Sequence, residues 1–159
     1  MFVLARALTY SSLFIGFLLV FLPARILSRA GIERPSSFGT VQAIGSVFGI
    51  TGVFLAIWCI LTFVLEGRGT PAPFDPPRQL VANGPYRFVR SPMYLGALFA
   101  LVGAALYFGS WGLLGYGVVF GVAAQVFVLA YEEPILRRTF GRAYEEYCRS
   151  VPRWVPRWP

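Results

Sequence analysis

The stretch from Val41 to Leu65 is an uncharged, apolar run of 25 residues, and it constrains the fold more than any other feature of the sequence. A transmembrane helix needs about 20 consecutive apolar residues, so this run is long enough to cross a bilayer with some tilt. The composition agrees, because 57% of the residues are hydrophobic and only 13% are charged, against about 25% charged residues in soluble domains. The sequence therefore predicts an all-α integral membrane protein.

Three further apolar segments accompany this run, and together they predict about four transmembrane helices in a single membrane domain over residues 1–159. The spans cover about residues 4–22, 41–65, 93–108 and 112–131. The first has the charge and apolar core of a signal peptide but no small-residue cleavage site, so we expect it to be retained. The short link at residues 110–112 predicts that the last two spans form a helical hairpin.

Glycines recur four residues apart in two of these spans, at Gly45 and Gly49 and again at Gly117 and Gly121. Small residues allow helices in lipid to approach one another closely. We therefore expect these glycines to serve helix packing rather than ligand binding.

The distribution of arginine predicts the orientation of the bundle. The net charge is +7, and all 14 basic residues are arginines. Three lie between the first two predicted spans, four between the second and third, none between the third and fourth, and six in the tail. Positive loops favour the cytoplasmic side, so we expect both termini in the cytoplasm, in a bacterial inner membrane. Loop arginines of this kind also explain the positive net charge, so we expect no nucleic-acid partner. We expect membrane lipids to surround the protein.

The chain contains no histidine, and this excludes several kinds of catalytic site. Ser-His-Asp and Cys-His nucleophile systems both require an imidazole base. The two cysteines, Cys59 and Cys148, are far apart and have no metal-ligand spacing. We therefore expect no metal site.

Residues 83–92, NGPYRFVRSP, form a polar segment directly before the third predicted span. Asn-Gly-Pro predicts a turn, and Pro92 suits the first turn of a helix. Arg87 and Arg90 are open to two interpretations. They could hold a carboxylate by paired hydrogen bonds, or they could anchor the span at the lipid headgroups, which composition alone favours.

Two adjacent carboxylates, Glu132 and Glu133, end the fourth predicted span and precede Pro134. Proline removes a backbone donor and disfavours helical geometry at the residue before it, so we expect the helix to break or kink here. The carboxylates need a positive partner, or else they begin the tail helix, whose first turn favours acids. Gln125, seven residues earlier, shares their helix face and predicts either an interhelical hydrogen bond or part of a polar lining.

The tail from 134 to 151 predicts an amphipathic helix at the cytoplasmic surface. Its apolar residues recur at spacings of three and four, which places them on one stripe: Leu136, Phe140, Tyr144, Tyr147 and Val151. Such a helix could lie in the membrane interface and cover the mouth of the bundle.

The segments GPYRFVRSPMYLG and EEPILRRTFGRAYEEYCRSVPRW together resemble the integral-membrane methyltransferases related to isoprenylcysteine carboxyl methyltransferase and the phospholipid methyltransferases. The order and spacing of Gly-Pro-Tyr, Arg-x-Pro-x-Tyr-x-Gly and Glu-Glu-x-x-Leu-x-x-x-Phe-Gly carry the resemblance, which covers Asn83 to the C-terminus. The chain departs from the family pattern at Ser91, where the family usually has histidine.

The resemblance implies a pocket facing the cytoplasm that binds S-adenosylmethionine. Its loop is expected at residues 83–92. The expected cofactor-binding residues are Gly84, Pro85, Tyr86, Arg87, Arg90, Ser91, Pro92, Tyr94, Gly96, Glu132 and Glu133. The expected catalytic residues are Arg90, Glu133 and Arg153, and the expected substrate-binding residues are Gln125, Tyr144 and Tyr147. Arg90 and the glutamates are expected to hold the cofactor rather than to transfer protons.

The implied reaction moves a methyl group to a lipophilic or lipid-anchored acceptor that reaches the site from the bilayer. A carboxylate acceptor of the isoprenylcysteine type needs no base, whereas an ammonium acceptor must first lose a proton; other oxygen, sulfur or nitrogen acceptors stay open. Two other functions compete: a non-catalytic scaffold or binder that keeps the fold, and a sterol-type NADPH reductase.

Overall fold

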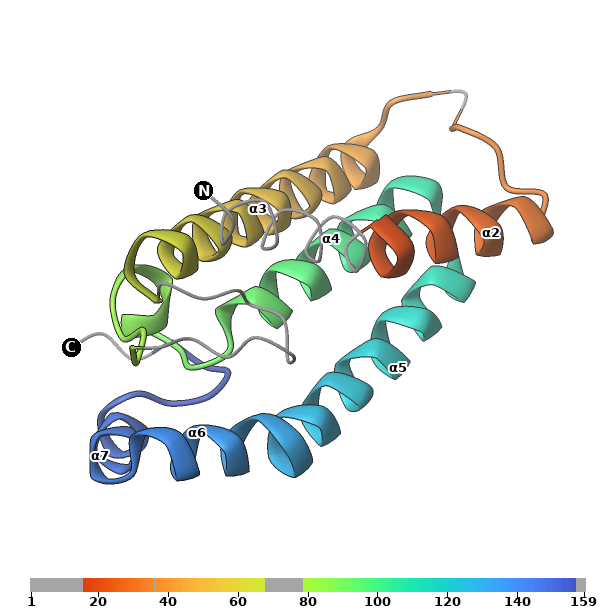
Figure 1. Ribbon diagram of the computed structural model, residues 1–159. Helices are drawn as coiled ribbons and strands as arrows, with labels where there is room; N and C mark the ends of the chain where they lie inside the picture. Colours follow the sequence, from red (N-terminus) through yellow and green to blue (C-terminus); the bar gives the residue numbers. More distant parts are fainter. Residues whose placement is uncertain (1–15, 36, 68–78, 157–159) are drawn as a thin grey trace.

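The computed structural model describes residues 16–35, 37–67 and 79–156, and all regular structure within them is helical (Figure 1). Residues 4–15 of the first predicted span lie outside this part. The elements in chain order are η1 (Gly16–Phe21), α2 (Leu22–Arg29), α3 (Thr40–Thr62), η2 (Phe63–Gly67), η3 (Gly84–Arg87), α4 (Pro92–Phe108), α5 (Trp111–Phe127), η4 (Val128–Glu132), α6 (Glu133–Phe140) and α7 (Arg142–Ser150).

The helices α3 and α4 form the most extensive interface of the fold, and they lie side by side along most of their length (Figure 1). Glycines make this close approach possible. A Cβ atom on Gly52 would lie 2.5 Å from the backbone nitrogen of Ala100, and one on Gly45 would lie 2.7 Å from the carbonyl oxygen of Gly103. Neither distance leaves room for a side chain, so the two backbones are in direct contact here.

The helices α4 and α5 form the predicted hairpin. Gly109 ends α4 in the left-handed conformation, with φ +62°, which glycine adopts without a steric penalty. Ser110 then begins α5, because its hydroxyl oxygen accepts a hydrogen bond from the backbone N–H of Leu113 at 3.3 Å. The helix α2 also packs against α5.

The chain continues from α5 into α6 without leaving helical geometry, through the π-helical turn η4. Figure 1 shows the path changing direction between α5 and α6, as the sequence predicts at Pro134. The helix bends rather than breaks. A π turn pairs each carbonyl with an N–H five residues on, so it accommodates a position where the usual donor is missing.

The tail consists of two helices, α6 and α7, in place of the single helix predicted for residues 134–151. Gly141 separates them with φ +52° and ψ −124°, a conformation that is open essentially to glycine alone. The predicted apolar stripe nevertheless packs together. Tyr144, Tyr147 and Val151 are buried in one cluster, and Leu136 and Phe140 pack against it.

Two helices of the described chain are long and apolar enough to cross a membrane by length and composition: Thr40–Thr62 and the continuous helix Trp111–Phe140. Pro92–Phe108 is apolar but shorter. Large apolar side chains face outward on the two long helices, with Ile50 69% exposed and Val119 65% exposed. An apolar exterior of this extent suits lipid rather than water. The count of four spans and the orientation of the termini stay predictions.

Candidate functional site

The segment before α4 is folded tightly against the end of α3. Gly84 has φ +56°, and a Cβ atom there would lie 3.0 Å from the hydroxyl oxygen of Thr62, so glycine suits the position on both counts. Gly84 begins the short 3-10 helix η3, which places the ring of Tyr86 edge-on against Phe63, with the centroids 5.1 Å apart. Pro92 then begins α4, as predicted. This compact path brings Arg90 to the end of the bundle where α5 runs into α6.

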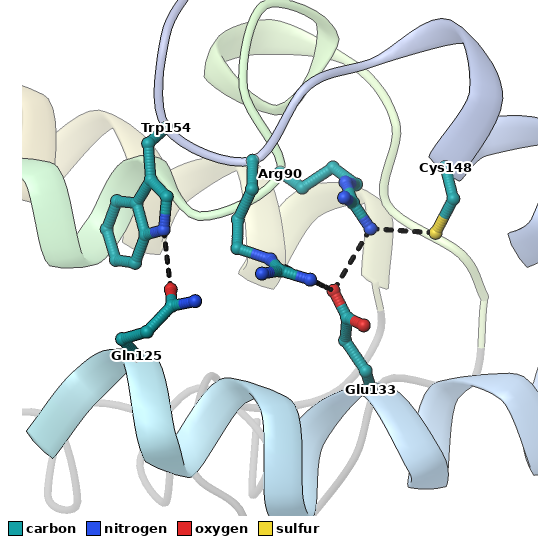
Figure 2. A network of polar contacts seen from close by, with 6 residues as sticks. Arg90, Gln125, Glu133, Cys148 and Trp154 are labelled. Carbon is teal, nitrogen blue, oxygen red and sulfur yellow. Dashed lines mark hydrogen bonds and ion pairs between the residues drawn. The ribbon is translucent and has the colours of Figure 1, made fainter. Parts of the chain in front are cut away.

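Glu133 lies at the centre of a network of polar contacts (Figure 2). It is the first residue of α6 and is only 8% exposed. Its Oε1 atom accepts a hydrogen bond from Nη1 of Arg90 at 3.0 Å and another from Nε of Arg153 at 3.1 Å. Nη2 of Arg153 donates to the same oxygen. Two guanidiniums therefore converge on one carboxylate oxygen.

Arg90 makes a further contact and retains one unpaired donor. Its Nη1 lies 2.8 Å from the sulfur of Cys148 (Figure 2). Its Nε is buried and has no hydrogen-bond partner among the described residues. Burial acts to lower the pKa of Arg90, but the neighbouring groups Cys148, Glu133 and Tyr144 together raise it by more, so the guanidinium stays charged. A buried charged donor without an acceptor is costly unless something else meets it.

Residues 152–154, which follow α7, cross over this network. The backbone N–H of Arg90 donates to the carbonyl oxygen of Pro152 at 2.9 Å, and that of Ser91 donates to the carbonyl oxygen of Arg153 at 3.3 Å. Trp154 donates from its indole Nε1 to the side-chain oxygen of Gln125 at 2.7 Å (Figure 2). These contacts join three regions that are distant in sequence: the loop before α4, the C-terminal end of α5 and the chain after α7.

Two tyrosines complete the polar surroundings. The hydroxyl of Tyr94 donates to Oε2 of Glu132 at 3.2 Å, and the hydroxyl of Tyr147 donates to the carbonyl oxygen of Tyr86 at 2.6 Å. Burial raises the pKa of Tyr86, Tyr144 and Tyr147 above their ordinary value, so these phenols stay protonated.

We expect Tyr147→Phe to lower the free energy of unfolding by about 1–3 kcal/mol, because it leaves the buried carbonyl of Tyr86 without its donor. Thermal unfolding in detergent micelles, followed by circular dichroism, measures this loss. Tyr131→Phe is the matched control, because Tyr131 is 41% exposed. An equal thermal midpoint for Tyr147→Phe and the wild type would contradict a structural role for this hydroxyl.

A cavity of about 30 Å³ lies between these elements, with room for one or two water molecules. Its polar wall includes Arg90, Ser91, Glu132 and Glu133. Aromatic and aliphatic side chains form the rest of the wall: Phe63, Leu80, Val81, Tyr86, Val128, Leu136, Tyr144 and Tyr147. Ligands of cofactor size occupy pockets of several hundred Å³, so part of this enclosure has to move before one fits.

Comparison with known proteins places these residues in a wider group. Residues 40–143, more than half of the chain, match the phospholipid methyltransferase family. The chain belongs to that family. The resemblance drawn from the sequence motifs is thereby confirmed at the level of the family. The match includes Arg90, Glu132 and Glu133 and ends before Arg153.

A second comparison finds a reductase. An 81-residue stretch is 38% identical to Delta(14)-sterol reductase of Mus musculus, and it covers 50% of this chain and 19% of the reductase. The chain thus spans about a fifth of the length of that relative. No solved structure matches the chain significantly.

The structure brings most of the predicted site residues of this phospholipid methyltransferase family member to one end of the bundle. Arg90, Glu133 and Arg153 are in direct contact. The other predicted residues that line the cavity are Tyr86, Ser91, Glu132, Tyr144 and Tyr147. Gln125 lies near the C-terminal end of α5, outside the lining of the cavity. Its side-chain oxygen accepts a hydrogen bond from Trp154 in the non-helical chain after α7, rather than from another helix.

Two predicted cofactor residues lie away from this network. Arg87 is exposed, and its guanidinium lies 5.4 Å from the ring centroid of Phe88. Gly96 faces α3, where a Cβ atom would lie 2.9 Å from the carbonyl oxygen of Gly52. Its described surroundings are therefore those of a helix-packing residue.

Sequence reasoning missed Cys148 and Trp154 as members of the network. Cys148 follows Tyr147 and lies four residues after Tyr144, a spacing that places it beside the buried face of α7. That spacing was the available signal. Nothing in the sequence indicates the pairing of Trp154 with Gln125, because it depends on how the chain turns back after α7.

Proposed function

We propose that the chain is a membrane methyltransferase that uses S-adenosylmethionine and methylates a lipophilic acceptor. The observation that carries the proposal is the ion pair of Arg90 and Glu133, which both lie within the region that matches the family. Acidic and guanidinium groups are both present there, and an amino-acid end of a ligand requires both.

The residues suit the charges of this cofactor. Nε of Arg90 is a buried donor without an acceptor among the described residues, and a ligand carboxylate would supply one. Glu133 and Glu132 offer carboxylates to an ammonium group, and the hydroxyl of Tyr94 lies next to Glu132. When bound, S-adenosylmethionine supplies a methyl group on a positively charged sulfur.

The absence of histidine narrows the acceptor class. Methyl transfer to a carboxylate or thiolate needs no proton acceptor, whereas transfer to an ammonium group requires one. Glu132 and Glu133 are the carboxylates that line the cavity, and both are already hydrogen-bonded. We therefore favour an acid or a thiolate on a lipophilic molecule, of which an isoprenylcysteine-type carboxylate is one example, and we place the protein in a bacterial inner membrane with both termini in the cytoplasm.

A transfer assay tests the proposal. Purified protein in detergent is incubated with S-adenosylmethionine carrying an isotope-labelled methyl group and with a total lipid and small-molecule extract. We expect label in an organic-soluble product, whose identity by mass spectrometry gives the acceptor atom. Measurable binding of S-adenosylhomocysteine without transfer to any acceptor would favour the non-catalytic binder. No binding at tens of micromolar would overturn the proposed function.

The similarity to a sterol reductase supports a second candidate function, a nicotinamide-dependent reductase. The two candidates predict different ligands. Parallel calorimetric titrations with S-adenosylhomocysteine and with NADPH distinguish them, and binding of NADPH alone would favour the reductase.

A further inference from the structure

The chain beyond α7 forms a non-helical segment across the site, which we term the strap (Val151–Pro156). Val151 is buried against Tyr144 and Tyr147 and fixes one end. Beyond it, the strap is held by two backbone hydrogen bonds to Arg90 and Ser91, by the contact of Arg153 with Glu133, and by the hydrogen bond of Trp154 with Gln125.

The strap occupies one oxygen of a carboxylate that a cationic ligand could use. Oε1 of Glu133 accepts one hydrogen bond from Arg90 and two from Arg153. A carboxylate oxygen offers about two lone-pair directions, so this oxygen has no capacity for a further donor. An ammonium group can use it only after a guanidinium has left.

Arg153 is the guanidinium that is able to leave. Arg90 is followed by the buried residues Ser91 and Pro92 at the start of α4, and it also contacts Cys148. Arg153 belongs to a segment without secondary structure, and this segment becomes exposed from Val155, which is 75% exposed. Moving the strap breaks the two backbone hydrogen bonds and the two side-chain contacts named above, whereas moving the backbone of Arg90 disturbs the start of α4.

Charge balance favours the same exchange. With Arg153 in place, two guanidiniums face one carboxylate at Glu133. When Arg153 withdraws, Arg90 and Glu133 remain as a neutral pair. An amino-acid end adds one carboxylate, which suits the unpaired Nε of Arg90, and one ammonium, which suits Glu133. The charges of Arg90, of Glu133 and of the amino-acid end then each have a partner.

We propose that Arg153 is a built-in stand-in for the ligand's ammonium group, and that the strap has to open before the cofactor binds. The hydrogen bond between Trp154 and Gln125 acts as the latch that holds the strap closed. This inference rests on the proposed function, since it names the same cofactor. It also accounts for a cavity of only about 30 Å³ beside so polar a wall.

The latch is tested by removing one hydrogen bond while every charge stays in place. Trp154→Phe removes the indole donor and Gln125→Met removes the acceptor. Trp111→Phe is the matched control, because Trp111 is 84% exposed at the opposite end of α5. The probe is S-adenosylhomocysteine, and its association rate with the full chain in detergent is measured by surface plasmon resonance.

We expect each latch variant to raise the association rate about threefold to tenfold, the effect of one hydrogen bond, and the double variant to add nothing more. The control should match the wild type. Rates equal to the wild type in both latch variants would overturn the proposal. So would weaker binding by Arg153→Gln, because a stand-in competes with the ligand and its removal strengthens binding.

Amide hydrogen exchange gives a readout that does not depend on any ligand. The amides of Arg90 and Ser91 bond to the strap, so they should exchange faster in Trp154→Phe than in the wild type or in Trp111→Phe. Unchanged exchange would refute the latch, and faster exchange with unchanged association would show that opening does not control binding. If the wild type binds no S-adenosylhomocysteine, the proposed function fails. The hydrogen-exchange result still tests whether the hydrogen bond between Trp154 and Gln125 holds the strap closed.

Discussion

Replacing Glu133 by glutamine is expected to weaken binding of S-adenosylhomocysteine by about tenfold to a hundredfold. A hydrogen bond to a charged group contributes about 1.5–3 kcal/mol, and tenfold in affinity corresponds to about 1.4 kcal/mol. Glutamine keeps the shape of the side chain and one carbonyl acceptor for Arg90, so the helices should stay in place. The charge that meets the ligand's ammonium group is lost.

Isothermal titration calorimetry in detergent micelles measures this loss, with circular dichroism as the check on folding. Glu146→Gln is the matched control, because it makes the same change of charge on the exposed face of α7. Arg90→Ala should also weaken binding, through loss of the ligand's carboxylate partner. Wild-type affinity in Glu133→Gln, with Glu146→Gln also normal, would show that the site lies elsewhere.

Replacing Gly103 by alanine is expected to destabilise the bundle strongly, although it adds only one methyl group. A Cβ atom at this position would lie 2.6 Å from the carbonyl oxygen of Gly45 and closer still to the backbone nitrogen of Gly49. Both obstacles are backbone atoms of α3, which cannot rotate away as a side chain can. Overpacking of this kind costs about 1–3 kcal/mol, and here the two helices have to separate.

The same helix pair offers a sharp control. Gly49 lies on α3, four residues after Gly45, yet a Cβ atom on it would have no neighbour within 4 Å. Gly49→Ala should therefore keep the wild-type thermal midpoint or raise it slightly, since alanine favours helix. Thermal unfolding of the two variants in parallel decides the matter, and equal midpoints would mean that α3 and α4 are not in backbone contact.

The elements of this fold are largely predictable from the sequence, because long apolar runs and their boundaries follow from local chemistry. Pro92 marks a helix start in the sequence and in the structure, and the link predicted at residues 110–112 lies where α5 begins. Gly141 shows where this reasoning stops. Apolar spacing continues smoothly across it, so periodicity alone predicts one tail helix, whereas the backbone turns there with φ +52°.

The sequence indicated where the site lies more readily than which residues form it. Arg90 and Glu133 come from motifs with recognisable order, and they meet in the structure. The contacts of Arg90 with Cys148 and of Gln125 with Trp154 depend on the return path of the chain after α7. The crowding of three donors on one oxygen of Glu133 is likewise a property of three-dimensional packing, and no sequence pattern expresses it.

The π turn η4 links the long apolar helix α5 to Glu133, and its position at this joint affects where the carboxylate points. Such a turn holds about one residue more than an α turn, and each residue of an α-helix advances the facing direction by about 100°. The one additional residue in η4 therefore determines the direction, around the helix axis, in which the side chain of Glu133 points. One insertion or deletion at this joint would therefore rotate Glu133 and the helix α6 about the helix axis relative to α5, without changing the residues that pack within either helix.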